Sequence, residues 1–102
     1  MPEEVARDLK GDTPPVLLDV RERHELALAR IDGAVHIPLG QLAARAEAEL
    51  DADASVVVFC HHGVRSLAGA ALLMQLGFTD VASMRGGIEY WAVSVDRSVG
   101  RY

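Results

Sequence analysis

Cysteine is almost absent from this chain: Cys60 is the only one among 102 residues. A lone cysteine excludes an intramolecular disulfide and any zinc or iron–sulfur site built from several cysteines. Basic residues are also in deficit, with 10 Lys and Arg against 15 Asp and Glu, so the net charge is −5. Because nucleic-acid binders normally carry a basic surface, we expect no nucleic-acid partner.

Long apolar runs and a leader-like start are missing as well. No apolar stretch reaches the roughly 18–20 residues that cross a bilayer. The opening segment, MPEEVARDLK, lacks the basic and apolar regions of a signal peptide. These absences predict a cytoplasmic protein without a membrane partner. Since domains usually hold about 100–150 residues, we expect a single domain over residues 1–102.

The apolar pattern alternates between strand-like and helix-like segments. The expected strands cover residues 16–20, 34–37, 55–59 and 80–84, and the expected helices cover residues 2–9, 22–29, 39–50, 65–76 and 88–91. Such alternation is typical of an α/β fold with a mainly parallel central sheet and helices on both faces. The helix at 65–76 has almost no polar face, so we expect it to be largely buried.

The segment around Cys60 carries the strongest functional signal. Ligands of parallel sheets bind at the carboxyl ends of the strands, and both Asp19 and Cys60 fall at such ends. After Cys60 the chain passes through a tight loop into a helix, whose free amides and dipole form a cradle for negative charge. That setting favours a nucleophilic thiolate, and Gly63 permits a turn that a side chain would obstruct. The plain alternative is that Cys60 is a small buried core residue.

Four motifs follow one another along the chain: LLDVRERHE at 17–25, IDGAVHIP at 31–38, CHHGVRS at 60–66 and RGGIEYW at 85–91. In this order they make the chain resemble the single-domain rhodanese family, the thiosulfate sulfurtransferase-like proteins. The third of them, CHHGVRS, is similar to the active-site loop of that family, and together the motifs span most of the chain. One departure is His36, which stands where the family usually has Asn.

The resemblance implies an enzyme that moves a sulfane sulfur through a persulfide. Cys60 would attack the outer sulfur of a donor such as thiosulfate and then pass that sulfur to a thiol or cyanide. Arg65 would contact an oxyanion or brace the loop, and the amides of residues 61–65 would cradle the persulfide. No cofactor and no metal are expected. The implied site comprises Cys60 as catalytic residue, the loop residues His61, His62, Gly63, Val64, Arg65 and Ser66, and the supporting residues Asp19 and Arg85.

Charged residues outside the loop have plainer interpretations. A buried carboxylate needs a partner, so we expect Asp19 to pair with Arg65 or the loop amides, or else to cap the following helix. Arg21 and Arg23 could steer anionic donors, but a solvated surface position is the favoured interpretation. His24 and His36 lack a pattern that would hold a metal.

Two other functions remain open at this stage. A phosphatase or arsenate reductase on the same scaffold uses Cys-x5-Arg, whereas Cys60 and Arg65 are separated by four residues, so the shorter loop argues for sulfur. A persulfide carrier would accept sulfur from a partner enzyme and deliver it to another protein. That function would still need Cys60.

Overall fold

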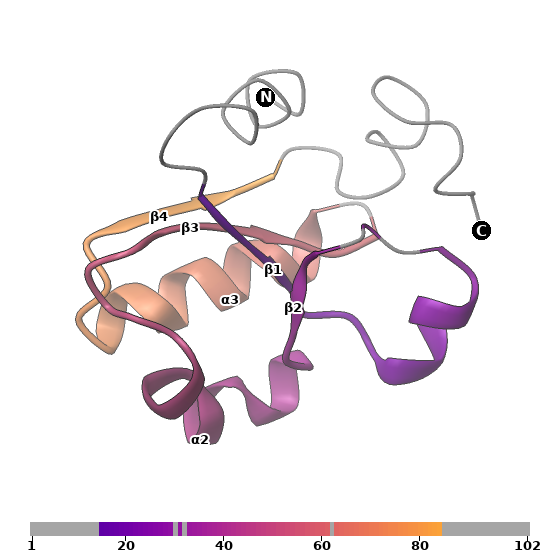
Figure 1. Cartoon of the computed structure of the whole chain (residues 1–102), viewed down its shortest axis with the longest axis horizontal. Helices are drawn as coiled ribbons and strands as arrows, with labels where there is room; N and C mark the ends of the chain where they lie inside the picture. The colour runs from indigo at the N-terminus through magenta and orange to yellow at the C-terminus, as the bar shows by residue number, and fades with distance from the viewer. Residues whose placement is uncertain (1–14, 30, 32, 62, 85–102) are drawn as a thin grey trace.

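The computed structural model describes residues 15–29, 31, 33–61 and 63–84, and it forms a parallel four-stranded sheet with helices packed beneath it (Figure 1). The strands lie in the order β2-β1-β3-β4. Along the chain the elements are β1 (Val16–Asp19), the 3-10 helix η1 (Arg23–Ala27), β2 (Val35–His36), α2 (Leu39–Glu49), β3 (Ser55–Phe59), α3 (Val64–Gln75) and β4 (Asp80–Ser83). This confirms the predicted α/β class and parallel sheet.

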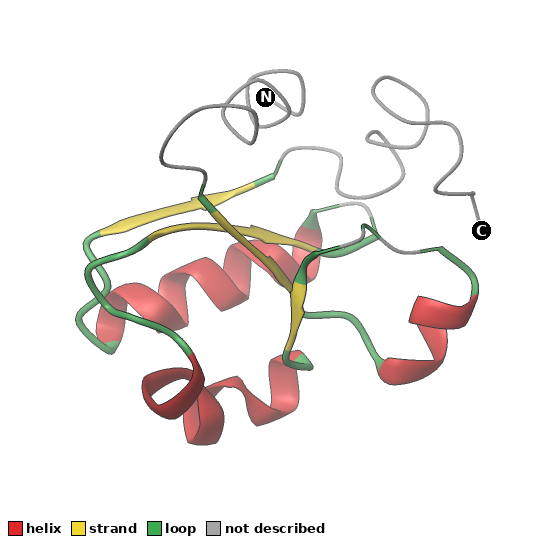
Figure 2. Ribbon diagram, in the orientation of Figure 1, coloured by secondary structure: helices red, strands yellow, loops and turns green. Residues whose placement is uncertain are grey.

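The sheet register places the carboxyl ends of three strands at the same end of the sheet. β3 pairs in parallel with both β1 and β4, and Asp19 lies opposite Phe59 while Ser83 lies opposite Val58. Because all pairings are parallel, the carboxyl ends of β1, β3 and β4 face the same way (Figure 2). Cys60 follows directly after β3 and therefore emerges at this edge.

The helices depart from the prediction in two respects. η1 is a five-residue 3-10 helix rather than a helix over 22–29. α3 is not largely buried: Ser66, Gly69, Ala70 and Leu73 are buried, but Val64, Leu67 and Met74 are 78%, 65% and 62% exposed, respectively. A helix that packs on a sheet has only one of its own faces covered. A helix that is apolar all round therefore leaves some apolar side chains exposed to solvent. The predicted helices at 2–9 and 88–91 lie outside the described residues.

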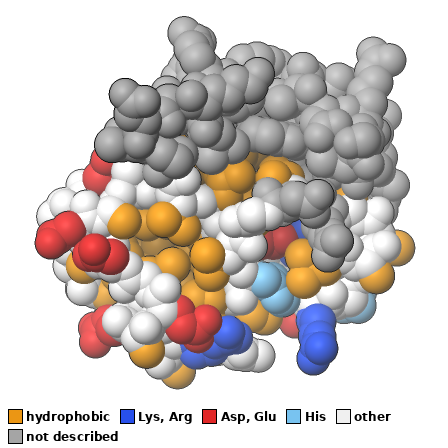
Figure 3. Space-filling model, viewed as in Figure 1, with side chains coloured by type: hydrophobic (Ala, Val, Ile, Leu, Met, Phe, Trp, Pro, Cys, Tyr) orange, Lys and Arg blue, Asp and Glu red, His pale blue; other side chains and the backbone are white. Residues whose placement is uncertain are grey.

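The surface is correspondingly mixed. In Figure 3 the charged side chains of the described surface lie mostly along its lower and left rim, with hydrophobic side chains among them. Over the described residues, no helix combines the length and the apolar character needed to span a membrane.

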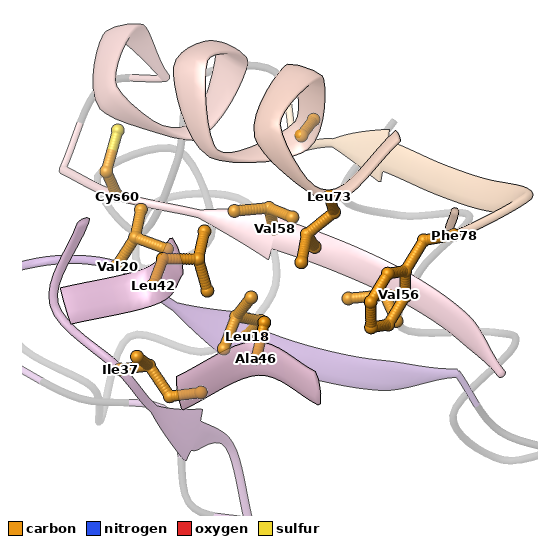
Figure 4. Packing of buried hydrophobic residues seen from close by; sticks show 11 residues of the cluster. Leu18, Val20, Ile37, Leu42, Ala46, Val56, Val58, Cys60, Leu73 and Phe78 are labelled. Atoms are coloured by element: carbon orange, nitrogen blue, oxygen red, sulfur yellow. The ribbon is translucent and has the colours of Figure 1, made fainter. Parts of the chain in front are cut away.

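The core of the described residues lies between the sheet and the two α-helices, which share one face of the sheet (Figure 4). A Cβ placed on Gly69 of α3 would lie 3.2 Å from Val58 in β3 and 3.6 Å from Leu42 in α2, so glycine permits this close approach. Cys60 belongs to the same cluster and lies at one end of it. The buried cluster thus holds both β3 and α3 in place, and these are the two elements that flank the cysteine.

Candidate active site

Cys60 follows the carboxyl end of β3, one of the two inner strands, and is 1% exposed. The preceding residues, Val56–Phe59, are all buried, as expected of a strand covered on both faces. A continuous apolar strand fixes the position of the residue that follows it. The sequence therefore places the cysteine correctly at the edge where parallel sheets bind ligands.

Two backbone amides at the N-terminal end of α3 donate to the Cys60 sulfur. The N–H of Gly63 lies 3.1 Å from Sγ and that of Ser66 lies 3.4 Å away. The sulfur thus occupies the place of a capping oxygen at a helix N-terminus. Gly63 precedes α3 with φ of +111°, a left-handed conformation that favours glycine. The donation by Ser66 lies just beyond the 61–65 range expected from the sequence.

The Ser66 side chain fastens the same turn to the neighbouring strand. Its hydroxyl donates to the Gly63 carbonyl at 2.9 Å, and its oxygen lies 2.6 Å from Oγ of Ser83. Since a hydroxyl has one hydrogen, Ser83 is the donor to Ser66. Ser83 was missed by the sequence reasoning, although its position at the end of β4 is a signal that places it on the same edge as Cys60.

Arg65 makes a forked ion pair with Glu25 of η1. Nη1 lies 2.5 Å from Oε1 and Nη2 lies 2.9 Å from Oε2. The Arg65 side chain is 36% exposed and that of Glu25 is 10% exposed. Glu25 was not singled out as a site residue. The available signal is its spacing from Glu22, whose backbone N–H donates to Glu25 Oε1 at 3.0 Å as at a helix start.

The expected pairing of Asp19 with Arg65 or the loop amides is wrong, because Asp19 binds Arg21. The guanidinium donates from Nε to Oδ1 at 3.0 Å and from Nη2 to Oδ2 at 2.8 Å, and the Arg21 amide donates to Oδ1. The surface position expected for Arg21 is also wrong, since it is fully buried, whereas Arg23 is exposed. A guanidinium has enough donors to be satisfied in the interior. Its Cζ also lies 5.9 Å from the centroid of the Phe59 ring.

The histidines occupy different surroundings. His36 in β2 places Nε2 2.8 Å from the Arg21 carbonyl. A carbonyl only accepts, so Nε2 carries the proton and the ring supplies a donor where the resembling family has an amide. His61 is half-buried in the loop. His62 and Arg85 lie outside the described residues, and within the described set no three His, Cys, Asp or Glu side chains group as a metal site would require.

This arrangement stabilises negative charge on sulfur. The two amides and the positive end of the α3 dipole all face Sγ, and they act in a buried position where such interactions are strong. The Val64 side chain, on the same turn, is exposed to solvent. The geometry suits a thiolate, whose charge lies on Sγ, or a persulfide, whose charge lies on the sulfur bonded to Sγ.

Comparisons with known proteins agree with this geometry. The family model described as "Rhodanese-like domain" matches residues 1–94. Thiosulfate sulfurtransferase GlpE of Pseudomonas fluorescens (strain SBW25) is 38% identical over 91 residues, covering 89% of this chain and 82% of the relative. A sulfurtransferase of Allochromatium vinosum is 40% identical over 83 residues, covering 80% and 77%. A rhodanese-related protein of Thermoplasma volcanium has a similar crystal structure, with a TM-score of 0.82, 31% identity and coverage of 92% and 89%.

The chain therefore belongs to the rhodanese-like domain family. Its similarity to sulfurtransferases extends over most of its length and includes the cysteine loop. It is accordingly an enzyme of the sulfurtransferase class.

Proposed function

We propose that this enzyme transfers a sulfane sulfur from a thiosulfate-like donor to a thiol or cyanide through a persulfide on Cys60. The observation that carries the proposal is the pair of amides, from Gly63 and Ser66, that donate to the Cys60 sulfur. The names of the sulfurtransferase relatives support the same reaction class. We further propose that residues 1–102 act as one rhodanese domain in the cytoplasm.

The reaction divides into two displacements on sulfur. In the first, the Cys60 thiolate attacks the outer sulfur of thiosulfate, the S–S bond of the donor breaks, and sulfite leaves with the bonding electron pair. In the second, a thiolate or cyanide attacks the outer sulfur of the persulfide, and the Cys60 thiolate leaves. The negative charge lies on Sγ in the thiolate and on the adjoining outer sulfur in the persulfide, so amides fixed around Sγ lie beside the charge in both states.

The burial of Cys60 favours a small donor. With 1% of its surface exposed, the residue is accessible only to compact reagents, and thiosulfate is one. The loop residues His61 and His62 and the supporting residue Arg85 stay predictions as contacts for donor or acceptor. No cofactor enters either displacement.

One observation favours a persulfide carrier as the second candidate. Val64, Leu67 and Met74 form an exposed apolar row that starts four residues after Cys60. Exposed apolar side chains beside a site are typical of protein contacts. In a carrier, the acceptor of the second displacement would be a protein thiol rather than a small molecule.

The chemistry of a phosphatase or an arsenate reductase is the weaker alternative. Such chemistry needs a cation directed at the bound oxyanion, whereas Arg65 is engaged by both carboxylate oxygens of Glu25. The four-residue spacing between Cys60 and Arg65 supports the same conclusion.

Intact mass after incubation with thiosulfate tests the proposal. The wild type should gain the mass of one sulfur atom, cyanide should remove it with release of thiocyanate, and Cys60→Ser should gain nothing. Wild-type protein blocked beforehand with iodoacetamide is the second control. An adduct that forms but turns over slowly with cyanide and small thiols would favour the carrier, whereas no adduct from thiosulfate would overturn the thiosulfate proposal.

A further inference from the structure

The short helix η1 is held on one side by the buried Arg21. The Arg21 guanidinium donates to the carbonyl of Glu25 at 3.4 Å and to that of Ala29 at 2.7 Å while it binds Asp19 at the end of β1. Arg21 is 0% exposed, so these contacts lie in the interior, where hydrogen bonds are strong. The backbone of η1 is thereby fixed relative to the sheet.

On its other side, η1 holds the start of α3 through one side chain. Both oxygens of Glu25 bind both terminal nitrogens of Arg65, which is the fork-to-fork geometry that restrains orientation as well as distance. Glu25 and Arg65 are 40 residues apart in sequence. Their pair therefore ties together two elements that are distant in the sequence.

Arg65 lies within the turn that forms the sulfur cradle. Its neighbours in that turn, Gly63 and Ser66, supply the amides that face Cys60 Sγ. A restraint on Arg65 thus limits the movement of both amides. The Arg65 guanidinium is directed at Glu25, whereas the backbone amides of this turn face the sulfur.

We infer that Glu25 is a positioning residue for sulfur transfer, and that it acts by holding Arg65 as a brace of the cysteine loop rather than as a ligand of the donor oxyanion. The inference rests on the proposed function for its reaction. In this arrangement η1, which lies outside the cysteine loop, supports the turn whose amides face the Cys60 sulfur.

A double-mutant cycle over Glu25→Gln, Arg65→Gln and the double variant tests this. Glutamine matches the size of Glu25 and is shorter than Arg65, and in neither position can it reproduce the fork. Both single variants should lower kcat with thiosulfate by about tenfold or more, since small displacements of a catalytic site have effects of this order, and KM should change little. If Glu25 acts through Arg65, the double variant should be no slower than Arg65→Gln alone.

Alkylation of Cys60 by iodoacetamide separates a brace from an oxyanion ligand, because this neutral reagent carries no oxyanion. A brace predicts slower alkylation in both single variants. Glu49→Gln is the matched control, since Glu49 makes the same kind of pair with Arg45 on α2, and it should leave all rates unchanged. Glu25→Asp keeps the charge and should recover part of the rate, and it serves if Glu25→Gln does not fold.

The inference is overturned if Arg65→Gln raises KM for thiosulfate while alkylation proceeds at the wild-type rate. It is equally overturned if folded Glu25→Gln matches the wild type in both assays. A wild type that forms no persulfide would instead refute the proposed function. In that case the alkylation rates would still decide whether Glu25 positions the loop.

Discussion

Asp19–Arg21 and Arg45–Glu49 are the same kind of ion pair in opposite surroundings. Their closest distances are similar, at 2.8 Å between Nη2 and Oδ2 in the first and 2.5 Å between Nε and Oε2 in the second. The side chains of the first pair are 0% and 1% exposed, whereas those of the second are 37% and 38% exposed. The first joins the sheet to η1, and the second lies within one helix.

Burial and connectivity, rather than distance, set what an ion pair contributes to stability. An exposed pair gains little because water and salt screen it. Breaking a buried pair leaves one charge in the interior without compensation, which costs far more than the pair's net contribution. Glu25–Arg65 lies between these two extremes in exposure.

Arg21→Met should show the largest effect. The substitution leaves the Asp19 carboxylate buried and also leaves the Glu25 and Ala29 carbonyls without this donor. We expect the free energy of unfolding to fall by about 3–5 kcal/mol, measured by urea-induced unfolding. Loss of the η1 anchor should also slow sulfur loading in protein that remains folded.

Two further variants test whether burial of the ion pair causes this loss of stability. Asp19→Asn combined with Arg21→Met removes the buried charge altogether, so it should be more stable than Arg21→Met alone. Arg45→Met is the matched change at the exposed pair. Equal losses for Arg21→Met and Arg45→Met would show that burial does not distinguish the two pairs.

Gly63→Ala should have the second largest effect. This substitution changes the backbone geometry of the site and leaves its charge unchanged. At φ of +111° a side chain is strained, so we expect a loss of about 1–3 kcal/mol in unfolding free energy. Relief of that strain would move the Gly63 amide away from Sγ, and sulfur loading should slow by about tenfold or more.

Gly77→Ala is the control for this change. Gly77 has φ of +101° at the far end of α3, and a Cβ there would meet no atom within 4 Å. It should lose stability in the same way but keep its loading rate. If the two variants lose activity equally, the effect belongs to the stability of α3 and not to the cradle.

The sequence predicts the elements of this fold better than it predicts the pairing of charges. Buried strands show as apolar runs, so β1 and β3 could be located, and Cys60 with them. Arg21 was misplaced because a charged residue after a strand looks solvated unless its partners are known, and those partners are a side chain and two carbonyls fixed by the tertiary fold. Glu25 and Arg65 are 40 residues apart, and no local pattern reports such a contact.

α3 shows a second limit of the same kind. Its apolar composition correctly predicts a helix that packs on the sheet, but composition does not say how many of its faces are covered. Leu73 is buried and Met74, the next residue, is 62% exposed. Which side chains face outward depends on the direction of approach of the sheet, which is a property of the whole domain.

Glu49→Gln should have the smallest effect on the free energy of unfolding, and the pH dependence of that effect shows whether the carboxylate charge is responsible. The hydrogen bond to Arg45 holds the pKa of Glu49 below its ordinary value of 4.5. A carboxyl whose pKa is lower in the folded state contributes stability above its unfolded pKa, and loses that contribution as the pH falls through the folded value. The wild type should thus be slightly more stable than Glu49→Gln near neutral pH, and the difference should shrink as the pH falls below 4.5 and vanish once the pH is below the lowered folded-state pKa. Urea unfolding across that range, with the exposed Glu47→Gln on the same helix as control, measures it. A difference that persisted in acid would mean that the Glu49 side chain stabilises α2 by something other than its charge, and the contrast with the buried pair would then have to be explained by packing.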